Sequence, residues 1–287
     1  MVSVHPVETL DIPDLAPYRT MRLQYEHRQR GIFVAEGEKV VRRLLESDLE
    51  VISLLLPAKW LEAYRDLLAR RPEKQIRAFT AEKSLLESLT GFTMYQGVLA
   101  IGRVPPPVRL EPILVRSQGS LLILAVEGVS NAQNLGGLVR NCVALGVDAM
   151  LLGESCCSPY LRRAVRSSMG TLFKFPVIES AALAADLKTA KENGLKIVAA
   201  HPHTNEKSLW QTDFTQPCII LVGSEGEGIS PPTLRLCDEV VAIPMHNDVD
   251  SLNVGTAGAI FLYEATRQRS SETGAPAQKQ KQPESNL

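Results

Sequence analysis

The chain has 287 residues, more than one average domain, which predicts two domains. Its 31 Lys and Arg residues against 32 Asp and Glu residues give a net charge of −1, so any nucleic-acid partner must be bound by local basic patches rather than by a global field. The absence of both a signal-peptide pattern and an apolar run of about 18 residues predicts a cytoplasmic protein that does not enter a membrane.

The first 105 residues alternate between helical and strand-like patterns, which predicts a small α/β domain. Its first helical pattern, over 16–30, contains a basic cluster of Arg19, Arg22, Arg28 and Arg30. Strands are expected at 31–37, 51–57, 76–80 and 96–104, with helices at 38–47, 59–71 and 81–90. Residues 106–113 then form a proline-rich linker that favours an extended spacer.

A second domain is predicted over residues 114–269. Strands are expected at 121–129, 148–154, 195–200, 218–225 and 239–245, and helices at 134–146, 158–170, 183–194, 231–238 and 251–261. The strands are apolar without polar alternation, which indicates a parallel sheet covered on both faces. Residues 270–287 are polar, without periodicity, and are predicted to be a disordered tail.

Polar loops follow the strands of the second domain, where ligands of parallel sheets bind. These loops are NAQNLGG (131–137), HPHTN (201–205), GSEGEGIS (223–230) and MHNDVDSLN (245–253). GSEGEGIS lacks the glycine spacing and the Lys-Ser/Thr pair of phosphate-binding loops, and Glu225 and Glu227 would repel a phosphate. The ligand of this loop is therefore expected to be cationic or rich in hydrogen-bond donors.

Several polar residues in these loops have a structural and a functional interpretation. Asn134 is expected to cap its helix, and Arg140 is either a solvated surface residue or part of a site. His201 and His203 lack a third ligand at matching spacing, so no metal is expected. Ser251 has no assignable base, and a capping role explains it equally well. The five cysteines show no CxxC spacing and are interpreted as small reduced core residues.

Three segments in chain order resemble the motifs of the SpoU (TrmH-like) ribose 2′-O-methyltransferases of the SPOUT superfamily. They are NLGGLVRNCVALG, LVGSEGEGIS and IPMHNDVDSLNVGTAGAIFLYEATRQR. The first domain, through FVAEGEKVVRRLLESDLEVISLLLP and QGVLAIGRVP, is similar to the L30e-like substrate-binding domain of many members. The resemblance implies an α/β protein with a knotted (trefoil), mainly parallel-sheet SPOUT methyltransferase domain after a small L30e-like domain.

This resemblance implies S-adenosylmethionine-dependent methyl transfer to a ribose 2′-hydroxyl of structured RNA. The L30e-like domain favours ribosomal RNA; a tRNA methyltransferase and a catalytically silent RNA-binding protein are the alternatives. A nucleotide-binding oxidoreductase is disfavoured by the glycine spacing. The family also holds its cofactor in the knot and dimerises there, so a homodimer is expected. The small residues of the helix at 251–261, including Gly255 and Gly258, would suit a threaded segment.

The motifs carry the family's functional positions onto this chain. Gly223, Ile243 and Leu252 are expected to contact the cofactor. Catalytic and substrate-positioning roles are expected for Asn134, Arg140, Glu225, Ser251 and Asn253. Arg140 is either the base or, more easily for a group with so high a pKa, an electrostatic partner of the developing alkoxide or phosphate. The chain departs from the family with Asn131-Ala132 in place of Asp-Pro, and with Asn247 in place of a glycine.

Overall fold

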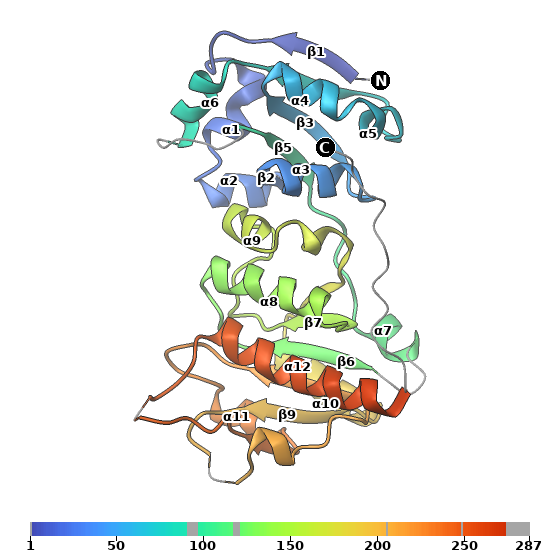
Figure 1. Ribbon diagram of the computed structural model, residues 1–287, viewed down its shortest axis with the longest axis vertical. Helices are drawn as coiled ribbons and strands as arrows, with labels where there is room; N and C mark the ends of the chain where they lie inside the picture. The colour runs from blue at the N-terminus through green and yellow to red at the C-terminus, as the bar shows by residue number, and fades with distance from the viewer. Residues whose placement is uncertain (1, 91–96, 117–120, 205, 248, 274–287) are drawn as a thin grey trace.

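Two α/β domains lie one above the other along the long axis of the molecule (Figure 1). The computed structural model describes residues 2–90, 97–116, 121–204, 206–247 and 249–273. No helix in these ranges is long and apolar enough to cross a bilayer.

The N-terminal domain is a five-stranded sheet in the order β1-β4-β3-β5-β2. Its strands are β1 (Val2–Pro6), β2 (Ile32–Glu36), β3 (Val51–Leu56), β4 (Ile76–Thr80) and β5 (Leu99–Arg103). β4 runs parallel to β1 and β3, whereas β5 is antiparallel to β2 and β3. The helical segments are η1 (Pro13–Leu15), α1 (Ala16–Arg19), α2 (Gln24–Gln29), α3 (Glu38–Leu45), α4 (Ala58–Ala63), α5 (Arg65–Ala69) and α6 (Lys83–Thr90).

Three features of this domain differ from the sequence-based expectation. The helix predicted over 59–71 is divided at Tyr64 into α4 and α5. β1 was not predicted, although it pairs with β4 along its whole length. The helix predicted over 16–30 is divided into α1 and α2, because the chain turns between them. Met21 lies in this turn with 2% of its surface exposed, and Thr20 Oγ1 donates to Ala16 O at 3.1 Å. Burial of Met21 in the domain core therefore overrides the local preference of residues 16–30 for one continuous helix.

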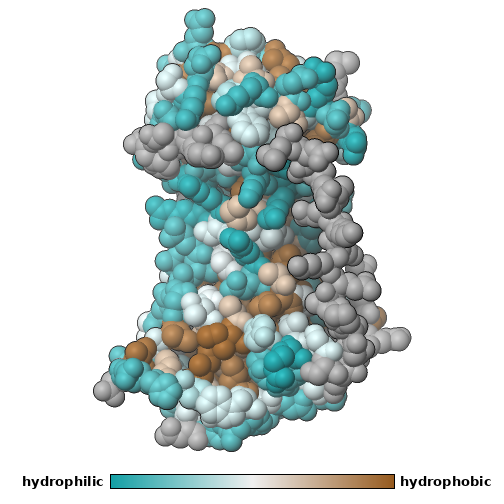
Figure 2. All heavy atoms as spheres, viewed as in Figure 1, coloured by the Kyte–Doolittle hydropathy of each residue, from teal (hydrophilic) through white to brown (hydrophobic). Residues whose placement is uncertain are grey.

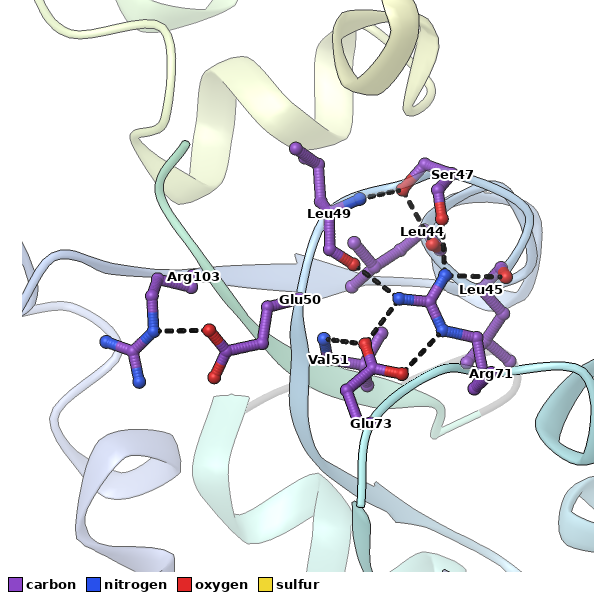
Figure 3. Close-up of polar contacts among 9 residues, drawn as sticks. All are labelled: Leu44, Leu45, Ser47, Leu49, Glu50, Val51, Arg71, Glu73 and Arg103. Carbon is purple, nitrogen blue, oxygen red and sulfur yellow. Dashed lines mark hydrogen bonds and ion pairs between the residues drawn. The ribbon is translucent and has the colours of Figure 1, made fainter. Parts of the chain in front are cut away.

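A buried ion pair organises the turn between α3 and β3 (Figure 3). The side chains of Arg71 and Glu73 are 5% and 12% exposed. The Arg71 guanidinium also donates to three backbone carbonyls of the turn, those of Leu45, Ser47 and Leu49. Burial raises the pKa of Glu73, but the hydrogen bonds from Arg71 and from Val51 N at 2.8 Å outweigh it, so the net pKa lies below the ordinary value.

We expect Glu73→Gln to lower the free energy of unfolding by on the order of 3 kcal/mol at neutral pH, since it leaves a buried guanidinium without its counter-charge. Because the folded-state pKa of Glu73 is depressed, its stabilisation exists above the pKa of the unfolded chain and is lost as the pH falls through the folded-state value. The difference between wild type and variant should therefore shrink in acid.

Urea denaturation at several pH values measures this effect. The matched control is Glu50→Gln, which removes a neighbouring ion pair with Arg103 whose side chains are 47% and 49% exposed. That change should cost less than about 1 kcal/mol. Equal losses in the two variants at pH 7 would contradict the interpretation of Glu73.

The C-terminal domain contains a six-stranded sheet in the order β11-β9-β10-β6-β7-β8. The strands are β6 (Leu122–Val126), β7 (Ala149–Leu152), β8 (Val177–Glu179), β9 (Lys196–Ala200), β10 (Cys218–Val222) and β11 (Glu239–Val241). Every pairing is parallel, which confirms the predicted parallel sheet. Apolar clusters cover both of its faces. The short edge strand β8 was not predicted.

The helical segments of this domain are α7 (Glu111–Arg116), α8 (Ala132–Ala144), α9 (Arg162–Ser167), η2 (Thr171–Lys174), α10 (Leu183–Glu192), η3 (Leu209–Gln211), α11 (Pro231–Leu234) and α12 (Val254–Thr273). α7 begins inside the predicted linker 106–113, because Pro112 occupies the first turn of a helix, where its missing N–H is not needed. β11 ends at Val241, four residues before the end of the predicted strand.

α12 continues past residue 270, where the disordered tail was predicted to begin. Arg269 holds its end by donating to Phe214 O and Gln216 O, both at 2.8 Å. These contacts bind the last turns of α12 to the segment before β10. The remainder of the predicted tail, 274–287, lies outside the described residues.

α8 lies between α9 and α12 and contacts both at very close range (Figure 1). A Cβ on Gly136 would come within 2.3 Å of Ala164 O in α9. On the other side, a Cβ on Gly258 of α12 would come within 2.6 Å of Leu138 Cδ2. The small residues that the sequence places in these helices therefore let three helices approach one another.

Two adjacent glycines of α8 provide a test of this packing. Gly136→Ala should destabilise the protein by about 1–3 kcal/mol, because the new methyl group meets backbone of α9. Gly137→Ala should stabilise it by up to about 1 kcal/mol, since a Cβ there meets nothing within 4 Å and alanine is the better helix former. Thermal and urea denaturation distinguish them, and two variants of equal stability would refute the close contact.

Candidate functional site

The side-chain amide of Asn253 joins the segment before α12 to the first turn of α8 and to the loop 223–230. Asn253 lies directly before α12, and its Nδ2 donates to Asn134 Oδ1 at 3.2 Å and to Glu225 Oε1. These partners are 119 and 28 residues away in the sequence. The structure thus brings together one predicted site residue from each of the three motifs.

The same residues organise the N-terminus of α12. Asn253 Oδ1 accepts hydrogen bonds from Gly255 N at 3.0 Å and Thr256 N at 3.4 Å, as a helix cap does. Glu225 Oε1 accepts from Val254 N at 3.4 Å and places a negative charge where the helix dipole favours one. Ser251 is exposed and precedes the cap, so the capping interpretation of Ser251 is wrong.

The expected cap of α8 is also wrong by three residues. The side chain of Asn131 accepts from Gln133 N at 2.9 Å and from Asn134 N at 3.4 Å, and α8 begins at Ala132. Asn131 is the residue that stands where the family usually has Asp, and an Asn side-chain oxygen performs the same capping function. Because Asn131 caps α8, the side-chain oxygen of Asn134 is available to accept a hydrogen bond from Asn253.

A cavity opens beside this junction, at the carboxyl ends of β9 and β10. All three residues predicted to contact a cofactor, Gly223, Ile243 and Leu252, line it, as do Glu225 and Ser251. Apolar side chains that were not predicted, among them Val222, Met245 and Phe261, form much of its wall. The predicted cofactor residues therefore share one cavity, with an apolar wall and a carboxylate at its edge.

The loop 223–230 is folded back on itself against this cavity. Ser224 and Gly228 pair through two backbone hydrogen bonds of 3.1 Å. A Cβ on Gly223 would lie 2.2 Å from the carbonyl carbon of Gly228, so only glycine fits there. Glu127, at the end of β6, holds the exit of the loop by accepting from Ser230 N at 3.0 Å and Ser230 Oγ at 2.8 Å.

His201 and His203 also line the cavity and were assigned no role from the sequence. The sequence feature that could have indicated a place in the site is their position, since HPHTN follows β9 at the same edge of the sheet. His201 Nδ1 accepts from His203 N at 3.2 Å, a contact within the loop. Among the described residues, no group of three His, Cys, Asp or Glu side chains is placed to hold a metal ion.

Arg140 lies less than two turns beyond Asn134 on α8 but does not line the cavity. Its side chain is exposed, and within the described ranges it has no hydrogen-bond or ion-pair partner. The next residue, Asn141, donates from Nδ2 to Gly255 O at 2.9 Å and ties α8 to the start of α12. Arg140 is thus presented to solvent from a helix that is fixed on both sides.

Two other sequence-based observations concern conformation and charge. Asn247 has φ of 60°, which confirms that asparagine takes the left-handed conformation that a glycine would supply. Within the basic cluster of the N-terminal domain, Arg19 is paired with Asp11. Arg28 lies close enough to Glu179 to oppose the rise that burial causes in the pKa of that carboxyl. The cluster is therefore partly neutralised by acidic neighbours.

Comparisons with known proteins agree with this arrangement. The SpoU rRNA methylase family matches residues 121–263. An uncharacterized tRNA/rRNA methyltransferase of Mycobacterium tuberculosis is 36% identical over 242 residues, which are 83% of this chain and 82% of that protein. The 23S rRNA (guanosine-2′-O-)-methyltransferase RlmB of Ralstonia nicotianae is 30% identical over 207 residues, covering 72% of this chain and 83% of that protein.

A solved structure shares the fold over most of the chain. The SpoU methyltransferase AviRb from Streptomyces viridochromogenes, in complex with the cofactor AdoMet, aligns with a TM-score of 0.74 and 27% identity. The alignment covers 89% of this chain and 99% of AviRb, so it includes both domains. Together with the shared cavity and the Asn253 junction, these similarities show that the chain belongs to the SpoU family of RNA methyltransferases.

Proposed function

We propose that the protein transfers the methyl group of S-adenosylmethionine to a ribose 2′-hydroxyl of structured RNA, with ribosomal RNA as the substrate class. The observation that carries this proposal is the Asn253 junction, which unites the three motifs at the edge of the cavity. Similarity to RlmB, a 23S rRNA (guanosine-2′-O-)-methyltransferase, favours ribosomal RNA over tRNA.

The cavity residues suit the chemistry of S-adenosylmethionine. The partly exposed side chains of Ile243, Met245 and Leu252 offer apolar surface to a flat base, and the backbone of the loop around Gly223 lines the same cavity. Glu225 and Glu227 also line the cavity, and their negative charge complements the sulfonium and the ammonium of this cofactor. A phosphate-bearing cofactor would be repelled by the same carboxylates.

The bound cofactor would supply an electrophilic methyl group to this site. Gly223, Ile243 and Leu252 would hold the cofactor beside the ribose O2′, which would accept the methyl group and lose its 2′ proton to water. The guanidinium of Arg140 offers several N–H donors and no acceptor, so we assign it to electrostatic stabilisation of the developing alkoxide or the adjacent phosphate. Asn134 and Asn253 position the substrate, and Glu225 orients Asn253.

We further propose the family's overall organisation for this chain. Residues 1–105 would act as an L30e-like RNA-binding domain, and residues 114–269 as the methyltransferase domain with the trefoil knot around its C-terminal helix. A cytoplasmic location fits an enzyme that acts on ribosomal RNA. Arg30 is a candidate phosphate contact in the first domain, because it is exposed and has no ion-pair partner among the described residues.

A homodimer formed across α12 and the end of α8 is the proposed assembly. Apolar side chains gather on the surface over α12 (Figure 2), where Ile260 is only partly buried and Tyr263 is 61% exposed. Val143 of α8 is 40% exposed. These side chains would be covered by the same face of a second copy.

Sedimentation equilibrium at micromolar concentration should then give about twice the 31.5 kDa mass of the chain. Tyr263→Glu should shift the protein toward monomer, because a carboxylate would be buried without a partner in the dimer. Lys188→Glu, on the exposed surface of α10, is the matched control and should leave the mass unchanged. A wild-type protein that sediments only as a monomer would remove this assembly.

Arg140 provides the sharpest test of the proposed function. Arg140→Ala should lower single-turnover methyl transfer from labelled S-adenosylmethionine to total RNA by on the order of 10²–10³-fold, as does the loss of an oxyanion donor. Arg140→Lys should restore part of the rate, since the charge remains while the planar fork is lost. Cofactor affinity, measured by calorimetry on the same preparations, should change little because Arg140 lies outside the cavity.

The ribose position is determined by mapping methylated nucleotides in the product RNA by mass spectrometry. Methylation of ribosomal RNA at a 2′-oxygen supports the proposal, and methylation confined to tRNA would replace the substrate class. A folded wild-type protein that shows no heat of binding with millimolar S-adenosylmethionine would refute the cofactor. Wild-type turnover in Arg140→Ala would remove Arg140 from the active site.

A further inference from the structure

Glu36 is a buried carboxylate at the boundary between the two domains. It ends β2, and 5% of its side chain is exposed. Two arginines of the C-terminal domain bond to its two oxygens: Arg162 Nη1 donates to Oε2, and Arg166 Nη1 donates to Oε1 at 2.8 Å. The carboxylate of one domain is thus held by the first and second turns of a helix of the other, α9.

Ring packing and one further hydrogen bond accompany this ion pair across the boundary. The ring of Phe33 packs against those of Tyr160 and Phe173, with centroids 5.3 and 5.4 Å away. Arg43 Nη1 also donates to Met169 O at 2.7 Å. Apolar contacts between rings hold two surfaces together but tolerate small displacements, whereas charged hydrogen bonds on both oxygens of one carboxylate fix distance and angle.

α9 passes this constraint to the proposed active site. Ala164, which lies between the two arginines, presents its carbonyl oxygen to Gly136 of α8, where a Cβ would come within 2.3 Å. Backbone therefore meets backbone, and α9 cannot move toward α8. Arg140 lies on the same helix, slightly more than one turn after Gly136.

We infer that Glu36 is a positioning residue: its bonds to Arg162 and Arg166 set the orientation of the N-terminal domain, so that RNA held there meets Arg140 in a reactive geometry. This inference rests on the proposed function. Displacement of a substrate by about 1 Å can cost on the order of 10²-fold in rate, so this orientation affects turnover although Glu36 touches no reacting atom.

The first measurement concerns the domains themselves and needs no RNA. Nitroxide-bearing unnatural amino acids at the exposed positions Asp66 and Lys188 place one spin label in each domain of the full-length protein. Labelled protein is diluted with an excess of unlabelled protein, so that a dimer holds at most one labelled copy, and double electron–electron resonance should then give one narrow distance distribution for the protein without a Glu36 or Arg166 substitution. Glu36→Gln and Arg166→Gln should broaden or shift it, because each weakens the ion-pair contact of Glu36 with Arg162 and Arg166, called the Glu36 joint below.

Glu38→Gln is the matched control. Glu38 lies two residues after Glu36 and also pairs with an arginine, Arg42, but within the N-terminal domain. Its loss should leave the distance distribution unchanged. Arg166 is 54% exposed, so Arg166→Gln is expected to fold even where substitution of the buried Glu36 does not.

Methyl transfer to total RNA then tests the consequence. Glu36→Gln and Arg166→Gln should lower turnover by about 10–100-fold while the dissociation constant for S-adenosylmethionine stays within about twofold. Combining Glu36→Gln with Arg162→Gln should cost less than the product of the two single effects, because both remove the same joint. A loss that appeared only as weaker cofactor binding would contradict a positioning role.

Failure of the inference and failure of the proposed function give different results. Distances and turnover in Glu36→Gln and Arg166→Gln that match those of Glu38→Gln would overturn the inference while leaving the methyltransferase activity in place. An unsubstituted protein without methyl transfer would refute the proposed function. In that case, a broadened distance distribution in Arg166→Gln would still support Glu36 as the residue that fixes the domains.

Discussion

The close approach of α8 to its two neighbours is the constraint on which the rest of the molecule depends. Gly136 admits the backbone of α9, and Gly258 of α12 admits the side chain of Leu138. α8 is therefore packed closely on both of these sides. The residues that it presents to the proposed substrate, Asn134 and Arg140, inherit that rigidity, as functional groups on packed helices do.

Hydrogen bonds of Asn253 and Glu127 fix the segments around the cavity in addition to the packing of α8. Asn253 uses its amide nitrogen to join Asn134 and Glu225, and its oxygen to cap α12, so one side chain satisfies the helix end and connects the motifs. The loop of Glu225 is held at its far end by Glu127 through Ser230. The loop that carries Glu225 is therefore held at both ends where it borders the cavity, which lowers the entropy lost when a ligand binds.

The parallel sheet could be predicted from the sequence because buried apolar strands are a local pattern, and the loops after them indicated where a site would lie. Gly223, Ile243 and Leu252 came from the resemblance to the family's motifs, whereas Val222, Met245 and Phe261 were not predicted to line the cavity. It placed helix ends poorly: Asn131, not Asn134, caps α8, since both are good caps and only the tertiary partner of Asn134 distinguishes them. β1 and β8 are short edge strands with little signal of their own. The Glu36 joint was beyond sequence reasoning, as its partners are 126 and 130 residues away.

The wide separation of Glu36 from its partners also matters during synthesis. The N-terminal domain leaves the ribosome first: its last strand, β5, ends at Arg103, and 59 more residues must follow before the chain includes Arg162. At ordinary translation rates this takes on the order of ten seconds. Throughout that time Phe33 and an unpaired carboxylate face the surroundings on an otherwise completed sheet. The surface that later holds the two domains together is thus, in the nascent chain, the one most open to a wrong partner or a chaperone.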